Sequence, residues 1–135
     1  MTDRRSFLKT SAVAVSALAL TQTGSALASD DTEYNGIVYT RENPGKWAKK
    51  VGSHAPVVTM KGSAVTVETK HPMSEAHYIV RHTLVLADGT VVGGTTFTPK
   101  DKPVSSYTLP PGYKGDLYAT SFCNLHDFWL TEVKV

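Results

Sequence analysis

One cysteine and five histidines carry most of the chemistry that this 135-residue chain offers. Cys123 and His126 form a C-x-x-H turn, which brings a soft thiolate and a borderline imidazole nitrogen within reach of one transition metal. His71 and His77 stand at the two ends of a loop that enters a long apolar run, and His54 precedes another apolar run. Four imidazoles and one thiolate on three connections predict a mononuclear metal site.

The single cysteine leaves several interpretations open, because it cannot form a disulfide within the chain. Cys123 could be a buried small hydrophobe, an intermolecular bridge, a reactive thiol or a metal ligand. Its neighbours favour the ligand, since a histidine follows three residues later. Pro72 holds His71 in an extended backbone and aims its ring away from the loop. The fifth histidine, His82, is expected to be an ordinary packed or solvent-exposed residue and not a ligand, on the strand face opposite to His77.

We expect strands and their connections to position these side chains, because the sequence after residue 35 has no helix pattern of useful length. Asp88-Gly89 predicts a two-residue hairpin turn, Gly93-Gly94 a bulge, and Pro44–Lys50 at most one short helical turn. Seven or eight short strands separated by turns predict an all-β domain, an immunoglobulin-like antiparallel β-sandwich of about seven strands. The expected strands cover residues 36–40, 57–60, 64–69, 77–87, 90–98, 105–109, 117–122 and 128–135.

The first 28 residues have the pattern of a twin-arginine signal peptide. Arg4-Arg5 is followed by an apolar stretch over residues 12–20 and by the small-residue sequence Ala-Leu-Ala at 26–28. The apolar stretch is shorter than the roughly 20 residues that span a hydrocarbon core, so no membrane anchor is expected after cleavage. Because this export route generally carries folded cargo, we expect the domain at 29–135 to take up its metal before it reaches the periplasm.

The charge of the mature domain excludes one class of partner. The whole chain has 14 basic and 12 acidic residues, and the leader contains three of the basic residues and one of the acidic ones. Cleavage would therefore leave 11 of each, a formal charge of zero. This balance gives no basic surface of the kind that binds nucleic acid.

The motifs together resemble those of the superoxide reductases. The strings are His71-Pro72-Met73, His77-Tyr78-Ile79, Cys123-Asn124-Leu125-His126 and an earlier His-x-Pro-Val at 54–57. They are similar to the one-iron neelaredoxin form, which corresponds to the iron-binding domain of desulfoferrodoxin, over about residues 46–135. The additional desulforedoxin domain has a four-cysteine iron site, for which this chain has no cysteines.

The resemblance implies one mononuclear non-haem iron, cycling between Fe2+ and Fe3+. Four imidazoles (His54, His71, His77 and His126) would form an equatorial square, with the Cys123 thiolate as the axial ligand. Superoxide would bind at the open sixth position, take one electron and leave as hydrogen peroxide after two protons arrive. A thiolate opposite this position favours electron transfer to the bound oxygen species, as it does in haem enzymes. Because the peroxide must be protonated before it leaves, we expect the iron close to the surface, where water can supply protons.

One departure from the family concerns the two residues before the first histidine. The family usually has Glu-Lys there, where the lysine attracts the anion and the glutamate closes the sixth position in the ferric state. This chain has Gly52 and Ser53 instead, so neither role carries over. Lys49 and Lys50 are close in sequence and could supply the positive potential that steers superoxide inward. The glutamate has no replacement, and water or hydroxide is expected in its place.

Two alternatives remain at the level of sequence. One is a family member that binds iron without efficient turnover, which the missing Glu-Lys pair allows. The other is a blue-copper-like electron-transfer protein, which uses two histidines, a cysteine and a weak axial methionine. No methionine follows Met73, which argues against copper. The enzyme would need an exported electron donor that the sequence does not identify, and the sequence permits a homo-oligomer.

Overall fold

The computed structural model describes residues 36–135, so the predicted leader lies outside the described residues. Within this part of the chain two short helical segments precede most of the strands: η1 (Gly45–Lys50), a 3-10 helix, and α3 (Val51–His54). The strands are β1 (Val38–Tyr39), β2 (Val57–Lys61), β3 (Ala64–Glu68), β4 (Ile79–Leu86), β5 (Val91–Thr96), β6 (Val104–Thr108), β7 (Asp116–Cys123) and β8 (Asp127–Lys134). No helix among the described residues is long and apolar enough to cross a membrane.

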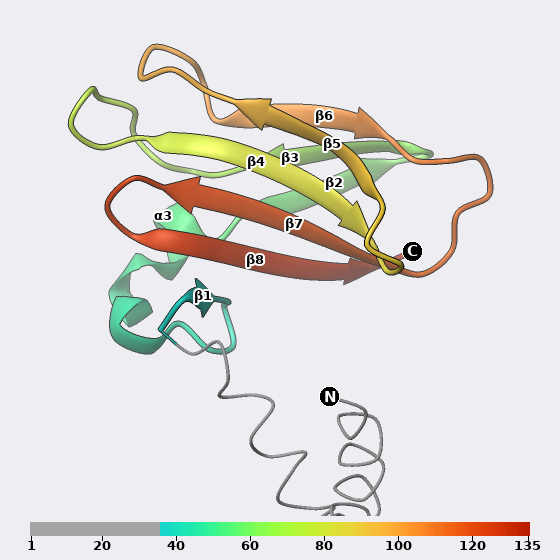
Figure 1. Ribbon diagram of the computed structural model, residues 1–135, viewed down its shortest axis with the longest axis horizontal. Helices are drawn as coiled ribbons and strands as arrows, with labels where there is room; N and C mark the ends of the chain where they lie inside the picture. Colours follow the sequence, from blue (N-terminus) through green and yellow to red (C-terminus); the bar gives the residue numbers. More distant parts are fainter. Residues whose placement is uncertain (1–35) are drawn as a thin grey trace, which may run out of the picture. The chain divides into compact units, whose positions relative to one another are not determined.

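The strands form two sheets that pack as a β-sandwich, as the alternation of the sequence predicted (Figure 1). One sheet has the order β1-β8-β7-β4-β5 and the other has the order β2-β3-β6. All neighbouring strands are antiparallel except β1 and β8, so the expected purely antiparallel arrangement was wrong at this edge. The buried ring of Tyr39 packs on Trp129, with centroids 5.6 Å apart, and this contact holds the two-residue parallel pairing.

The interior is divided into three groups of buried side chains. The largest lies between the sheets and contains Val65, Val67, Leu84, Leu86, Leu109, Leu117 and Ala119. A second group joins Tyr39, Ala55 and Trp129, with Trp47 and Val51 packed against it. The third contains Ile79, Phe97 and Cys123, with Met73 against it. The only cysteine therefore sits in a small apolar group of its own, away from the largest core.

The hairpin and the bulge lie where the sequence predicted them, but the hairpin loop is longer than the expected two residues. The Leu86 N–H donates to the Thr90 carbonyl, so three residues lie between this pair. Gly89 has a φ of +90°, and the Thr90 N–H donates to Asp88 Oδ1 over 2.9 Å, which closes the β4–β5 hairpin. A register shift places one extra residue beside Gly93, where the sequence predicted a bulge. A Cβ atom at Gly93 would lie 2.7 Å from the Tyr107 ring, so this position also needs glycine for close packing.

The helical segment is longer than the sequence predicted. The pattern allowed at most one short turn between Asn43 and Gly52, whereas η1 and α3 together run from Gly45 to His54. An isolated segment of this length has little helical stability in water. Packing of Trp47 and Val51 against a buried aromatic group supplies the missing stability. Propensity alone could not reveal this, because the stabilising contacts are tertiary.

A second bulge changes which side chains of β4 point inward. Ile79 pairs with Cys123 and Arg81 with Phe122, so Val80 is an extra residue in this strand. As a result Ile79 and His82 are both fully buried, although they are three residues apart. The alternation that was expected to separate His77 from His82 by sheet face therefore does not hold across this bulge. His82 points into the interior of the sandwich.

Candidate metal centre

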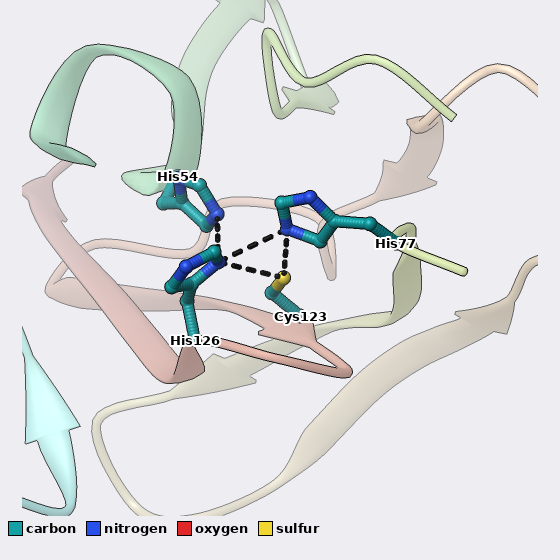
Figure 2. Close-up of side chains that lie close together, drawn as sticks. All are labelled: His54, His77, Cys123 and His126. Carbon is teal, nitrogen blue, oxygen red and sulfur yellow. Dashed lines mark hydrogen bonds between the residues drawn. The ribbon is translucent and has the colours of Figure 1, made fainter. Parts of the chain in front are cut away.

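Three connections at one end of the sandwich bring the predicted ligands together (Figure 1). His54 ends α3, His71 and His77 lie on the connection from β3 to β4, and the β7–β8 turn carries Cys123 and His126. We call these five residues the histidine–cysteine cluster. Figure 2 shows four of them, with the His54, His77 and His126 rings turned toward one another and the Cys123 sulfur beside them.

The nitrogens and the sulfur of the cluster face one another at short distances. His77 Nε2 lies 3.0 Å from His71 Nε2, 3.0 Å from His126 Nδ1 and 3.2 Å from Cys123 Sγ. His54 Nε2 lies 3.0 Å from His126 Nδ1, which in turn is 3.5 Å from the sulfur. Four of the predicted ligands have their ligand atoms within 4.8 Å of one another: His54, His77, Cys123 and His126. His71 lies outside this group and joins it through its contact with His77. Three of the histidines turn Nε2 inward, and His126 turns Nδ1.

The four imidazole rings follow one another in a closed circuit. Neighbouring ring centroids are 4.6 Å apart for His54 and His71, 4.4 Å for His71 and His77, 4.7 Å for His77 and His126, and 4.6 Å for His126 and His54. His54 and His77, which lie across the circuit, are 5.8 Å apart. The four rings therefore enclose one small region, and the sulfur lies beside the His77 and His126 rings.

These distances and donor types fit a transition metal. Two imidazole nitrogens bound at right angles to one ion, at about 2.1 Å each, lie about 3.0 Å apart, as the cluster nitrogens do. A neutral imidazole has one N–H and one lone pair, so hydrogen bonds cannot satisfy several inward-facing nitrogens at once. A cation accepts all of these lone pairs. Four imidazoles also exceed the two that a blue-copper site uses.

Burial favours the uncharged forms of His54, His71 and Cys123 in the absence of metal. It lowers the pKa of His54 to about 4, with further contributions from the His71 and His126 rings. It also lowers the pKa of His71 to about 4, with a contribution from His77. Burial acts in the opposite direction on the Cys123 thiol and raises its pKa. At neutral pH the His54 and His71 rings therefore have free lone pairs, whereas the thiol keeps its proton.

The end of α3 orients the first histidine. His54 Nδ1 lies 3.1 Å from the Lys50 carbonyl oxygen and 2.8 Å from Ser53 Oγ, and the serine hydroxyl donates to the same carbonyl over 3.2 Å. Because the N–H is directed at these acceptors, the lone pair of Nε2 is left for the cluster. Sequence analysis assigned no role to Ser53, since only the helical turn brings its hydroxyl beside the ring.

Asn124 ties two of the three connections together. Its side-chain oxygen accepts the Tyr78 N–H over 3.0 Å, and its side-chain nitrogen donates to the Ala76 carbonyl over 3.0 Å. These bonds fix the His77 end of the loop to the turn that carries Cys123 and the last histidine. Sequence analysis missed this contribution, although an asparagine inside a C-x-x-H turn is a residue type that often bonds to nearby backbone.

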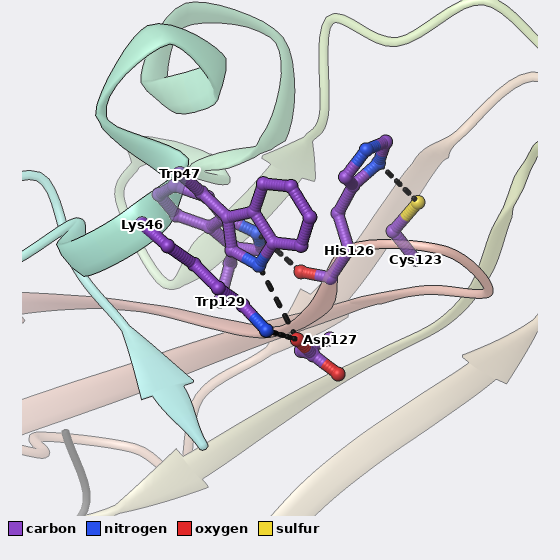
Figure 3. Close-up of polar contacts among 6 residues, drawn as sticks. All are labelled: Lys46, Trp47, Cys123, His126, Asp127 and Trp129. Carbon is purple, nitrogen blue, oxygen red and sulfur yellow. Dashed lines mark hydrogen bonds and ion pairs between the residues drawn. The ribbon is translucent and has the colours of Figure 1, made fainter. Parts of the chain in front are cut away.

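Two tryptophans hold the His126 end of the same turn (Figure 3). Trp129 Nε1 donates to the His126 carbonyl over 3.0 Å, and the Trp47 ring meets the His126 ring edge to face at 4.6 Å. Trp47 Nε1 also donates to Asp127 Oδ2 over 3.2 Å, and Lys46 Nζ lies 3.9 Å from the same oxygen. Asp127 has a φ of +65°, a strained value for a residue other than glycine, which these contacts help to hold.

The two lysines predicted to steer an anion end η1. Lys49 and Lys50 are both exposed, and the Lys50 carbonyl is the one that orients His54. The Lys50 ammonium also acts on the cluster: burial is the main cause of the lowered pKa of His126, and Lys50 adds to it. Among the described residues, Lys49 is not a cause of any of the shifted pKa values of the cluster side chains.

Comparisons with known proteins agree with this site. Residues 46–132 match the desulfoferrodoxin family. A superoxide reductase of Pyrococcus abyssi is 32% identical over 108 residues, which cover 67% of this chain and 92% of the relative. A solved superoxide reductase (neelaredoxin) of Ignicoccus hospitalis superposes with a TM-score of 0.64 at 26% identity, over 76% of this chain and 97% of that one. A superoxide reductase (1Fe-SOR) of Giardia intestinalis gives a TM-score of 0.56 at 25% identity, over 62% and 98%.

The raised pKa of the Cys123 thiol predicts proton release when metal binds. At pH 8 an ordinary imidazole is already neutral, but a thiol whose pKa lies above its usual range is still protonated. Anaerobic addition of Fe2+ to the metal-free protein at about pH 8 should therefore release about one proton per ion, because the metal takes the thiolate. A pH indicator in weak buffer measures this.

Cys123→Ser provides the control for this measurement. The serine hydroxyl does not ionise under these conditions, so this variant should release almost no protons for each ion that it binds. Equal release from the two proteins would show that the protons come from another group and would contradict the assignment.

Proposed function

The chain belongs to the desulfoferrodoxin family and acts as a superoxide reductase, and we propose that it does so at one iron held by all five members of the histidine–cysteine cluster. The reaction adds one electron and two protons to superoxide and forms hydrogen peroxide. The observation that carries the ligand assignment is the convergence of four imidazole nitrogens and the only cysteine sulfur, with neighbouring atoms 3.0 to 3.5 Å apart.

The iron, when bound, supplies the one-electron couple between its ferrous and ferric states. The protein contributes ligands that are ready to bind, because burial keeps the rings of His54 and His71 neutral. Cys123 contributes an anionic sulfur once its proton has left, and a thiolate ligand donates charge to a metal.

The position of the cluster suits a small charged substrate and a product that must be protonated. His77 and His126 are only partly buried, and Leu125 between the two ligands of the β7–β8 turn is 56% exposed. Solvent therefore reaches the edge of the cluster and can supply protons. This supports the expectation that the iron lies close to the surface.

Superoxide consumption without dioxygen release tests the proposed function. The purified, iron-loaded and reduced protein should consume about one superoxide per iron in a single turnover and form an equivalent amount of peroxide. A peroxide assay measures the product, and an oxygen electrode checks that no dioxygen is released. Oxidised protein should also show a sulfur-to-iron charge-transfer colour, which Cys123→Ser should lose.

Two outcomes would contradict this assignment. Release of dioxygen together with peroxide would indicate dismutation. Fully loaded protein that is reduced but does not consume superoxide would instead identify a family member that binds iron without turnover.

We propose that Lys50 provides the positive charge that attracts superoxide. Its ammonium is exposed and acts on the cluster: it lowers the pKa of His71 and His126, although burial is the larger cause in both. Burial raises the pKa of the Cys123 thiol, and Lys50 opposes that effect. Its charge thus contributes to the pKa values of three of the five ligands. Lys49, its neighbour on η1, is not among the causes of the shifted pKa values of these ligands.

Lys50→Ala should lower the second-order rate constant for superoxide by about threefold at low ionic strength, because one steering charge is lost. It should also flatten the salt dependence of this rate. The backbone carbonyl that orients His54 remains in the variant, so the iron spectrum should not change. Pulse radiolysis at several salt concentrations measures the rate.

Lys49→Ala and Lys61→Ala are the matched controls. Lys49→Ala should have the smaller effect of the two η1 variants, and Lys61→Ala, at the far end of β2, should have none. An unchanged rate in Lys50→Ala, or equal losses in all three variants, would remove Lys50 from this role.

We also propose that the protein works in the periplasm after export by the twin-arginine route, and that its sandwich is of the immunoglobulin-like type. The paired arginines, the short apolar stretch and the Ala-Leu-Ala sequence of residues 1–28 support export. The electron donor must then also be exported. An iron protein is suitable cargo because its metal can be inserted before the folded domain crosses.

Replacing Arg4 and Arg5 together by lysine should stop export, since the route requires the arginine pair and not simply positive charge. The full-length precursor should then accumulate inside the cell, while Lys9→Arg is exported normally. Immunoblots of cell fractions follow both forms. A double variant that reached the periplasm as efficiently as the parent chain would show that another route is used.

A further inference from the structure

A buried polar network lies between the two sheets, outside the ligand set. His82 is fully buried, and each of its ring nitrogens has a hydroxyl partner: Nε2 lies 2.8 Å from Thr69 Oγ1 and Nδ1 lies 2.8 Å from Ser105 Oγ. Thr69 Oγ1 also lies 2.8 Å from Ser121 Oγ. We call these four residues the His82 network.

Every ring nitrogen and hydroxyl oxygen of the His82 network has a hydrogen-bond partner when the ring is neutral. Burial lowers the pKa of His82 to about 4, so its ring has one N–H and one lone pair at neutral pH. The ring can donate to one hydroxyl and accept from the other, and the third hydroxyl can donate to Thr69 Oγ1. A satisfied network of this kind specifies one arrangement of its members, whereas apolar side chains of similar size can slide past one another.

The network connects strands of both sheets. His82 lies on β4 and Ser121 on β7, in the five-stranded sheet, while Ser105 lies on β6 and Thr69 directly follows β3, in the three-stranded sheet. A buried polar group costs free energy unless it is paired, and paired groups give little net stability over an apolar replacement. The network is therefore expected to contribute less to the stability of the fold than to the fixed positions of the chain segments that it joins.

Two members of the network stand two residues before a metal ligand. Thr69 precedes His71, and its carbonyl oxygen accepts the His71 N–H over 2.8 Å. Its own N–H donates to the Pro103 carbonyl over 3.0 Å. Ser121 precedes Cys123 on β7, where both side chains point inward. The contact between the Thr69 and Ser121 hydroxyls thus joins the chain segments that carry these two ligands.

His71 needs such support more than His54 does. The outer nitrogen of His54 is oriented by two acceptors at the end of α3, whereas His71 Nδ1 is buried and has no hydrogen-bond partner of good geometry among residues 36–135. The Pro72 backbone raises the pKa of the His71 ring against the larger effect of burial, but it makes no hydrogen bond of good geometry to Nδ1. The ring therefore depends on its backbone, which Pro72 restricts from one side and Thr69 holds from the other.

We propose that His82 is a positioning residue, which acts through Thr69 and Ser121 to hold the His71 ring at a fixed place relative to the Cys123 sulfur. This role rests on the proposed function only in that both use the same metal. A second contact supports it: the His82 ring meets Phe97 edge to face at 4.9 Å, and Phe97 belongs to the apolar group that contains Cys123.

Thr69→Val tests the proposal, because it removes the hydroxyl and keeps the shape of the side chain. The iron-loaded variant should lose iron to a chelator about tenfold faster than the parent protein, the size expected when an outer contact of a metal ligand is lost. The ferric protein should also show a shifted charge-transfer band and an altered electron paramagnetic resonance spectrum. His82→Leu should have the same effects.

A double variant with Thr69→Val and His82→Leu shows whether His82 acts through Thr69 or independently of it. If His82 acts through Thr69, Thr69→Val and His82→Leu together should change the iron loss no more than either alone. Thr69→Ser keeps the hydroxyl and should restore the parent spectrum. Should Thr69→Val fail to fold, Ser121→Ala removes one hydroxyl at the other end of the network and has the same expected result.

Val65→Ala is the control for general loss of stability. It removes volume from the largest apolar group, which contains no member of the network, so its thermal midpoint should fall while the spectrum and iron loss rate stay unchanged. Equal effects of Thr69→Val and Val65→Ala, or no effect of Thr69→Val, would overturn the proposal. Failure of the proposed function would appear separately, as parent protein that binds iron but does not consume superoxide.

Discussion

The lone pairs of several imidazole nitrogens converge on one small region of this protein, and the rest of the structure must hold the rings there. Imidazole nitrogens 3.0 Å apart cannot all satisfy one another by hydrogen bonds, so the cluster is unfavourable until a cation fills it. In the metal-free protein the loops that carry the rings would relax unless other contacts opposed this. The contacts around the cluster are therefore as much a part of the site as the ligands are.

Each connection is held by different chemistry. The His54 ring is oriented by a helix carbonyl and a serine hydroxyl. The turn from Cys123 to His126 is fixed by Asn124 on one side and by two tryptophans on the other. His71 is held through its backbone, at a point that the His82 network reaches. Because these supports share few residues, loss of one should leave the others intact, and each ligand can be examined separately.

The sequence predicted the parts of this protein that depend on local chemistry. Residue types and spacing were enough for the C-x-x-H turn, the hairpin at Gly89 and the existence of every strand, because turn conformation and alternation are local properties. It did not predict the length of the helical segment, the parallel pairing of β1 or the inward direction of His82. These follow from contacts between distant residues, such as Trp47 with His126, and from a bulge that leaves no clear sequence signal.

In the residues before His54, orientation of the histidine ring and attraction of the anion are assigned to different groups. The resemblance associates a lysine directly before this histidine with attraction of the anion, and that position is Ser53 here. The serine hydroxyl bonds to the ring itself, where a lysine side chain would instead extend toward solvent. In the proposed arrangement positive charge comes instead from Lys50, one helical turn earlier, since residues three to four apart share a helix face. The same residue thus contributes its carbonyl to the orientation of His54 and its ammonium to the potential around the cluster. Orientation and attraction are then separable, since a change of the Lys50 side chain alters the second and leaves the first.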